Sequence, residues 1–209
     1  MLRGIKLDSN KEISITSEIV DASFPNKVYI PLINNGVICE PLTKKGRKVK
    51  KGTIVGIRKD LDFPILSSVS GTVLDIKKCL YLNGEEVPCV VIDNDKKERV
   101  IKKVIKEDIT DYTKEEYVEL LKECAVTGMG GGDFPTYLKY KSPISILIVN
   151  IVECEPYITA DLMLTKLKAD IILESIDAIM KINNIRKCFI AYKKTNRIVE
   201  NALKEYISS

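Results

Sequence analysis

A glycine-rich stretch near the middle of the chain constrains the fold more than any other feature. Residues 128–132 contain four glycines, and a glycine backbone can approach a ligand closely because no Cβ is in the way. Pro135 and Thr136 suit the first turn of a helix, whose free N–H groups attract an anion. Lys139 can add a full positive charge beside them. The pattern predicts a phosphate-binding loop.

A buried strand is predicted at 145–150, because this stretch is apolar and rich in β-branched residues. The strand ends at Asn150, and two carboxylates, Glu153 and Glu155, follow it. Ligands of open α/β sheets bind beyond the carboxyl ends of the strands. We therefore expect these three side chains to accept hydrogen bonds from the non-phosphate part of a ligand.

An all-β domain is predicted over residues 24–105. The expected strands, separated by turn residues, are 28–32, 53–57, 71–76 and 89–92. The segments 46–52 and 67–73 resemble the biotinyl/lipoyl-like barrel-sandwich hybrid fold. Lys59 lies near the hairpin tip that carries the modified lysine in carrier domains, which leaves a carrier domain as an alternative. We expect a structural barrel, because the residues after Lys59 differ from a carrier context.

Residues 106–113 are expected to be a linker to an α/β region. Thr113 and Glu116 form a capping-box pattern that opens a helix ending near Cys124. A long helix capped by Asp161 and ending near Asn183, a strand at 186–192 and a helix at 196–207 are expected to follow. Strands 145–150 and 186–192, joined by a helix, predict a right-handed parallel crossover. The expected buried face of the long helix comprises Leu164, Leu167, Ile171, Ile172, Ile176 and Ile179.

Composition excludes several kinds of chemistry. The chain has 209 residues and a 45% hydrophobic content, enough for two domains, and no run approaches the roughly 20 apolar residues of a membrane span. It contains no histidine, which excludes imidazole acid–base chemistry. Its six cysteines form no C-x-x-C pair, so we expect reduced thiols, no metal site and no iron–sulfur cluster in this chain.

Lysine and arginine crowd two segments, 44–51 and 96–106, although the net charge is only +4. No aromatic residues are interleaved for base stacking, so we expect no nucleic-acid site. A solvated face is the expected role, and docking to an acidic or membrane-bound partner is the functional alternative.

The loop and strand together resemble the C subunit of the Rnf electron-transport complex, and more distantly the NADH-binding flavoprotein subunit of respiratory complex I. That family has a loop G-x-G-G-x-x-F-P-T-x-x-K and a strand end N-x-x-E-x-E-P. Met129 and Val152 stand where the complex I subunit has an arginine and an aspartate, which favours the Rnf branch. The proline-reductase-associated electron-transfer protein is a related alternative. The matching residues are Gly128, Gly130, Gly131, Phe134, Pro135, Thr136 and Lys139 in the loop, and Asn150, Glu153, Glu155 and Pro156 after the strand.

The resemblance implies an α+β multidomain protein. It has an N-terminal extension (1–23), an all-β barrel-sandwich hybrid (24–105), a linker (106–113) and the first part of an α/β FMN/NADH-binding domain (114–209). It implies FMN and NADH as cofactors, with no side chain as a catalytic group. The implied cofactor-binding residues are Gly128, Gly130, Gly131, Lys139, Asn150, Glu153 and Glu155.

The implied function is that of an electron-input subunit, which takes hydride from NADH onto FMN and passes electrons to [4Fe-4S] clusters outside this sequence. Implied partners are the other subunits of a membrane complex, NADH and, indirectly, ferredoxin. The implied location is the cytoplasmic face of the cell membrane, as a peripheral subunit. We expect an excised fragment or a truncated relative that is inactive alone. A carrier domain and a structural adaptor with a decayed flavin site are the alternatives.

Overall fold

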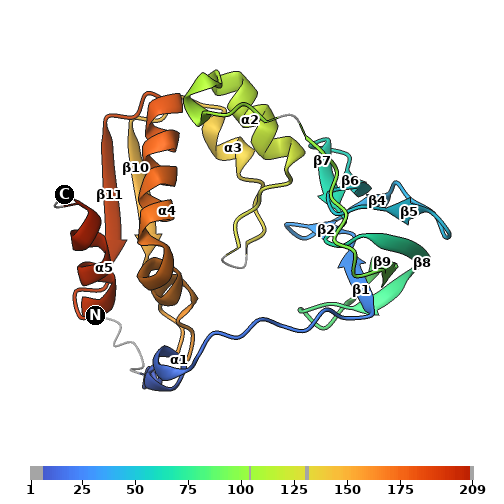
Figure 1. The fold of residues 1–209 in the computed structure, drawn as a ribbon, viewed down its shortest axis with the longest axis horizontal. Helices are drawn as coiled ribbons and strands as arrows, with labels where there is room; N and C mark the ends of the chain where they lie inside the picture. The colour runs from blue at the N-terminus through green and yellow to red at the C-terminus, as the bar shows by residue number, and fades with distance from the viewer. Residues whose placement is uncertain (1–6, 104, 130–131, 208–209) are drawn as a thin grey trace, which may run out of the picture. The chain divides into compact units, whose positions relative to one another are not determined.

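The computed structural model describes residues 7–103, 105–129 and 132–207 (Figure 1). The chain divides into two compact units. One runs from Ala22 to Ser142, and the other combines the segment up to Asp21 with the segment from Pro143 onward. Each unit has its own hydrophobic core.

The unit from Ala22 to Ser142 begins with an all-β domain. One sheet has the strand order β1-β9-β8-β5, a second has the order β4-β6-β7, and β2 and β3 form a hairpin. The neighbouring strands pair antiparallel. The strands are β1 (Lys27–Pro31), β2 (Ile33–Asn34), β3 (Val37–Ile38), β4 (Glu40–Pro41), β5 (Lys48–Val49), β6 (Ile54–Arg58), β7 (Phe63–Leu66), β8 (Gly71–Leu80) and β9 (Glu86–Asn94).

The core of this domain forms because alternate strand residues point inward, as the period of two requires. The four predicted strands are confirmed as β1, β6, β8 and β9. Gly71 is required where β8 meets β9, since an added Cβ would lie 1.9 Å from the carbonyl oxygen of Asp93. The core residues are Ile30, Leu32, Cys39, Val49, Val55, Val73, Val90 and Ile92.

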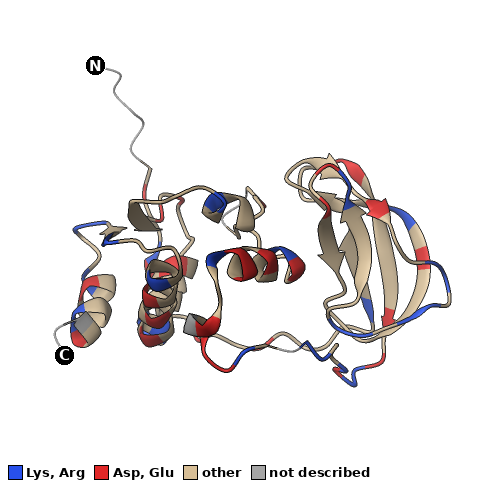
Figure 2. Cartoon of the chain, turned by 90° about the horizontal axis from the view of Figure 1, so that it is seen from above, with Lys and Arg blue, Asp and Glu red and all other residues tan. Residues whose placement is uncertain are grey.

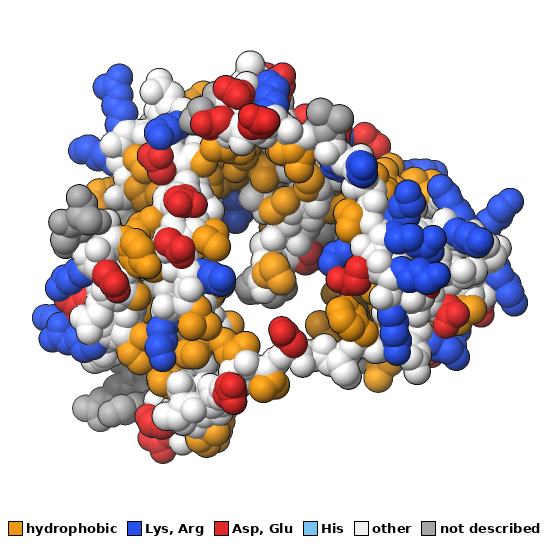
Figure 3. All heavy atoms as spheres, viewed as in Figure 1, with side chains coloured by type: hydrophobic (Ala, Val, Ile, Leu, Met, Phe, Trp, Pro, Cys, Tyr) orange, Lys and Arg blue, Asp and Glu red, His pale blue; other side chains and the backbone are white. Residues whose placement is uncertain are grey.

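The two lysine-rich segments of the sequence come side by side in this domain. Lys51 forms a parallel bridge with Val100, and the Lys51 N–H donates to the carbonyl oxygen of Arg99 at 2.9 Å. Basic side chains accordingly gather over the barrel strands (Figure 2; Figure 3).

Helical structure follows the barrel in the same unit. It consists of η1 (Ile109–Asp111), α2 (Lys114–Glu123) and α3 (Tyr137–Tyr140). The capping box is confirmed, because Thr113 Oγ1 accepts from the Glu116 N–H and Glu116 Oε2 accepts from the Thr113 N–H. The helix expected after Pro135 is only one turn long.

The second unit is an α/β layer. It contains α1 (Glu12–Thr16), β10 (Ile146–Ile151), α4 (Ala160–Ile182), β11 (Lys187–Tyr192) and α5 (Arg197–Ile207). β10 and β11 pair in parallel, with α4 as the connection, which confirms the predicted parallel crossover. Ile151, Leu162, Val199 and Leu203 form the core, and Ile15 of α1 packs against it.

The predicted start of α4 is wrong by two residues. Thr159 occupies the N-cap position, and Asp161 lies in the first turn. Figure 1 shows α4 beside the β10–β11 pair. Among the described residues, no helix combines the length and the apolar character that crossing a membrane requires.

The predicted buried face of α4 is also wrong. Leu164, Leu167 and Ile171 are 55%, 54% and 50% exposed. The backbone of Lys168 departs from helical geometry, with φ −141°, so one continuous stripe is not maintained along the helix. The buried residues of α4 are Leu162, Thr165, Ala169 and Ile176.

Candidate functional site

The glycine-rich stretch forms the end of a closed hairpin, residues 127–135, here called the glycine hairpin. Thr127 and Pro135 form an antiparallel bridge. The Gly128 N–H donates to the carbonyl oxygen of Phe134 at 3.0 Å. A Cβ built on Gly128 would come no closer than 3.9 Å to another residue, so the space beside this glycine is open. Gly130 and Gly131 lie outside the described residues.

Lys139 lies next to the glycine hairpin, on α3. Its Nζ is 6.0 Å from the centroid of the Phe134 ring, and the side chain is partly exposed. Because α3 spans only four residues, its dipole is small. Attraction of an anion to this region therefore depends on the lysine charge more than on the helix.

Asp133 places a carboxylate in the same hairpin. Its Oδ2 accepts from Asn34 Nδ2 at 3.0 Å and from the Asn35 N–H at 3.3 Å. The negative charge is thus engaged by donors of the barrel. A glycine backbone, a solvent-accessible ammonium and an acidic group tied to other donors together fit an anionic group such as the phosphate of FMN.

The end of strand β10 carries the other predicted residues. The carboxylate of Glu153 is buried, and its Oε1 and Oε2 accept from the N–H groups of Asp161 at 2.7 Å and Leu162 at 3.4 Å. Glu153 therefore satisfies the first turn of α4, where negative charge is favoured. Asn150 Oδ1 accepts from the Val152 N–H at 3.0 Å, and Glu155 is exposed.

Burial raises the pKa of Asp161, and the nearby carboxylate of Glu153 adds to the effect. Lys11 acts in the opposite direction and lowers the same pKa. The turn after β10 is thus a partly buried cluster of charges in which one lysine offsets two carboxylates.

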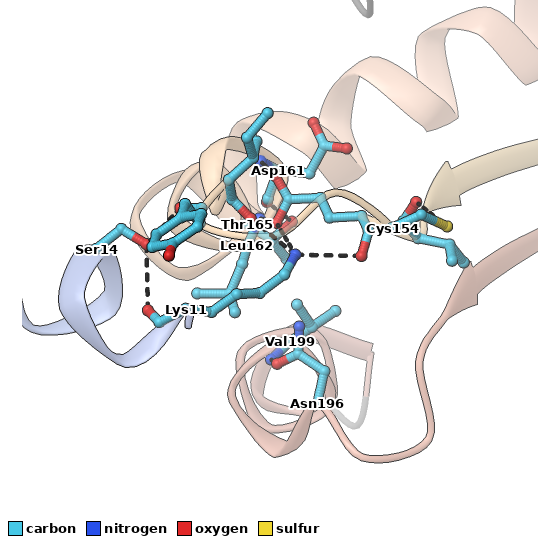
Figure 4. Close-up of polar contacts among 12 residues, drawn as sticks. Lys11, Ser14, Cys154, Asp161, Leu162, Thr165, Asn196 and Val199 are labelled. Atoms are coloured by element: carbon cyan, nitrogen blue, oxygen red, sulfur yellow. Dashed lines mark hydrogen bonds and ion pairs between the residues drawn. The ribbon is translucent and has the colours of Figure 1, made fainter. Parts of the chain in front are cut away.

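Lys11 is a functional candidate that the sequence interpretation missed. Its Nζ donates to the carbonyl oxygens of Ile158 at 2.7 Å and Glu153 at 3.1 Å, and lies 3.9 Å from the Glu153 carboxylate (Figure 4). Ser14 Oγ donates to the carbonyl oxygen of Tyr157 at 2.7 Å. The N-terminal segment therefore holds the turn after β10. Nothing in its sequence signals this role, because its partners are more than 140 residues away.

A hollow of about 450 Å³ opens at the carboxyl ends of β10 and β11. Ile151 and Glu153 line one part of it, and Lys193, Asn196 and Arg197 line another. This is the edge at which α/β sheets bind ligands. The sequence interpretation located the edge from β10 alone and did not include Lys193 or Arg197.

The predicted residues are divided between the two units. Gly128 and Lys139 lie in the unit from Ala22 to Ser142, and Asn150, Glu153 and Glu155 lie in the other. Their convergence on one cofactor stays a prediction. Among the described residues, no group of three or more cysteine, aspartate or glutamate side chains is arranged to hold a metal ion.

Comparison with known families supplies the relationship. Residues 1–97 match the model of the RnfC barrel-sandwich hybrid domain, and residues 121–209 match the Nuo51 FMN-binding domain. The chain is a relative of the Rnf C subunit. The predicted fold class, a barrel-sandwich hybrid followed by a flavin-binding α/β region, is confirmed by these matches.

Relatives in three bacteria, each the C subunit of its complex, show how much of such a protein is covered. The chain is 29% identical to that of the proton-translocating ferredoxin:NAD(+) oxidoreductase complex of Clostridium ljungdahlii, over 97% of this chain and 46% of that protein. It is 28% identical to that of the Na(+)-translocating complex of Acetobacterium woodii, over 99% of this chain and 48% of that protein. It is 33% identical to that of the ion-translocating oxidoreductase complex of Vibrio cholerae, over 84% and 24%. The chain thus spans about half the length of the first two relatives and less of the third.

Proposed function

We propose that this chain contributes the flavin-binding part of an electron-input subunit, which takes hydride from NADH onto FMN and passes electrons to [4Fe-4S] centres carried elsewhere. The observation that carries the proposal is the match of residues 121–209 to an FMN-binding domain, after a barrel of the Rnf C type. This match spans the glycine hairpin, Lys139 and the turn after β10.

The side chains support distinct roles in holding the cofactor. The backbone N–H groups of Gly128, Gly130 and Gly131 would face the phosphate or ring of FMN, and the solvent-accessible ammonium of Lys139 would neutralise phosphate charge. When bound, FMN supplies the conversion between a two-electron hydride and single electrons.

The turn after β10 would supply the remaining polar contacts. Asn150 and Glu155 are exposed and would accept hydrogen bonds from ribose hydroxyls or the nicotinamide carboxamide. Glu153 would act with them, and its bonds to the start of α4 would keep the turn in shape.

The partners proposed are the other subunits of a membrane electron-transport complex, with NADH as substrate and ferredoxin reached indirectly. The proposed location is the cytoplasmic face of the membrane, as a peripheral subunit. Support comes from the names of the relatives, which belong to proton- and Na(+)-translocating ferredoxin:NAD(+) oxidoreductase complexes.

The full-length protein that contains this sequence is expected to bind FMN and to reduce it with NADH. The test is a fluorescence titration of FMN against the purified protein, followed by anaerobic addition of NADH while the flavin absorbance is recorded. Bleaching of bound flavin by NADH supports the proposal. A full-length protein that binds no FMN contradicts it and favours the structural adaptor.

We expect Lys59 to be unmodified. Its Nζ pairs with the Glu40 carboxylate at 2.6 Å, and the hairpin tip beside it is fixed, because the Leu61 carbonyl oxygen accepts from the Tyr137 hydroxyl at 3.2 Å. Phe63 also stacks on Tyr137, with ring centroids 5.8 Å apart. A carrier lysine needs a free tip. The intact mass of the protein from its native host should equal the sequence mass, and a lipoyl or biotinyl increment on Lys59 would restore the carrier alternative.

A further inference from the structure

Asn34 joins the glycine hairpin to the barrel. It ends β2, directly before the tight turn at Asn35 and Gly36, and is 1% exposed. Its Nδ2 donates to the Asp133 carbonyl oxygen at 2.9 Å and to the Asp133 carboxylate at 3.0 Å. The Asn35 N–H donates to the same carboxylate oxygen at 3.3 Å. Three donor–acceptor contacts therefore converge on Asp133.

The barrel fixes the orientation of Asn34 before the hairpin is engaged. Asn34 Oδ1 accepts from Arg58 Nη1 at 3.2 Å. Because a guanidinium has only donors, the amide oxygen must face Arg58 and the amide nitrogen must face Asp133. Arg58 is itself held by Asp60, which accepts from its Nε at 3.0 Å and its Nη2 at 2.9 Å. The Asn34 amide is thus preset by its neighbours in the barrel.

The contact to Asp133 is not replaced by apolar packing. A hollow of about 450 Å³ borders it, lined by Asn34, Thr127 and Asp133 among others. Asp133 has φ +45°, a left-handed conformation that aspartate and asparagine tolerate better than most residues. Hydrogen bonds therefore hold the hairpin at this point.

We propose that Asn34 and Asp133 form a tether through which the barrel positions the glycine hairpin for flavin. The inference rests on the proposed function for its ligand, and it assigns the barrel a role in presenting the loop. Asp133 is a positioning residue, which acts through the backbone it holds. Its carboxylate is directed to barrel donors, so its charge is not needed for the ligand.

Asparagine and alanine at position 133 separate positioning from charge. Asp133→Asn keeps an oxygen that can accept from Asn34 Nδ2 and from the Asn35 N–H, and asparagine tolerates the same backbone. Asp133→Ala removes the acceptor. Asn34→Ala removes the donor from the other side and should act like Asp133→Ala.

The experiment uses the full-length protein and two measurements. Hydrogen exchange of the Gly128 and Thr136 amides, which close the hairpin, reports its order without cofactor. FMN fluorescence titration reports its function. Asp133→Ala and Asn34→Ala should each raise both the exchange rates and the FMN dissociation constant at least about tenfold, because a loosened hairpin must be ordered on binding. Asp133→Asn should leave both measurements within about twofold of the parent, since its bonds are retained.

Asp62→Ala is the matched control, because Asp62 also has a left-handed backbone, with φ +49°, but an exposed carboxylate. It should leave the hairpin amides protected. Unchanged exchange in Asp133→Ala overturns the tether, and so does an Asp133→Asn variant as impaired as Asp133→Ala. Faster exchange with unchanged FMN affinity overturns the flavin assignment of the hairpin while the structural tether stands.

Discussion

Replacing Glu153 by alanine should lower the free energy of unfolding by about 3–5 kcal/mol, the range for removing one partner of a buried charge pair. The change leaves Lys11, whose side chain is only 14% exposed, without its carboxylate. It also leaves the N–H groups of Asp161 and Leu162 without their acceptor. Urea denaturation of this chain, followed by far-UV circular dichroism, measures the effect because α4 and α5 supply much of the helical signal.

Glu155→Ala is the control for this variant, two residues away on the same turn and exposed. It should change the free energy of unfolding by less than about 0.5 kcal/mol, as surface substitutions do. Lys11→Ala should destabilise the same unit as Glu153→Ala, and the double variant should be less destabilised than the sum of the two, because the residues share one network. Equal stability of Glu153→Ala and Glu155→Ala would show that the turn does not depend on Glu153.

Replacing Lys139 by alanine in the full-length protein should weaken FMN binding by about 1–3 kcal/mol, the range for one charge-assisted hydrogen bond. The reason is local, since α3 is one turn long and contributes little dipole. The ammonium is then the main positive charge described beside the glycine hairpin. Fluorescence titration of FMN measures the change.

Lys141→Ala is a matched control, because Lys141 has the same charge two residues on but lies 5.0 Å from the Tyr137 ring centroid. It should bind FMN almost as well as the parent. Raising the ionic strength should narrow the difference between Lys139→Ala and the parent, because salt screens an exposed charge. If Lys139→Ala and Lys141→Ala bind FMN equally well, the phosphate does not lie beside Lys139.

Local patterns in the sequence predicted several elements correctly. The Thr113–Glu116 capping box depends on residues three positions apart, and the structure contains both of its hydrogen bonds. The strands at 145–150 and 186–192 were predicted from short apolar runs, and β10 and β11 lie within one residue of those bounds. The resemblance to the Rnf C subunit was predicted from the loop and strand-end motifs, which are also local.

The glycine hairpin shows where prediction stopped. Its glycines and Lys139 could be assigned from spacing alone. The orientation of Asp133 could not, because it depends on Asn34, which is 99 residues away in the sequence. Cap assignment failed at α4 for a similar reason: Asp161 had the residue type of a cap, but the buried Glu153 carboxylate already satisfies its N–H.

What the sequence determined by itself was the order of the elements, the loop chemistry and the family relationship, since each depends on neighbouring residues. Only the tertiary structure decided which face of α4 is buried. That helix is apolar on several sides, so periodicity allowed more than one face, and packing against the sheet and α5 selected Leu162, Thr165, Ala169 and Ile176. The tertiary structure also decided the pairings of Lys11 with Glu153 and of Asn34 with Asp133. Contacts over such separations depend on chain folding, which no local pattern encodes.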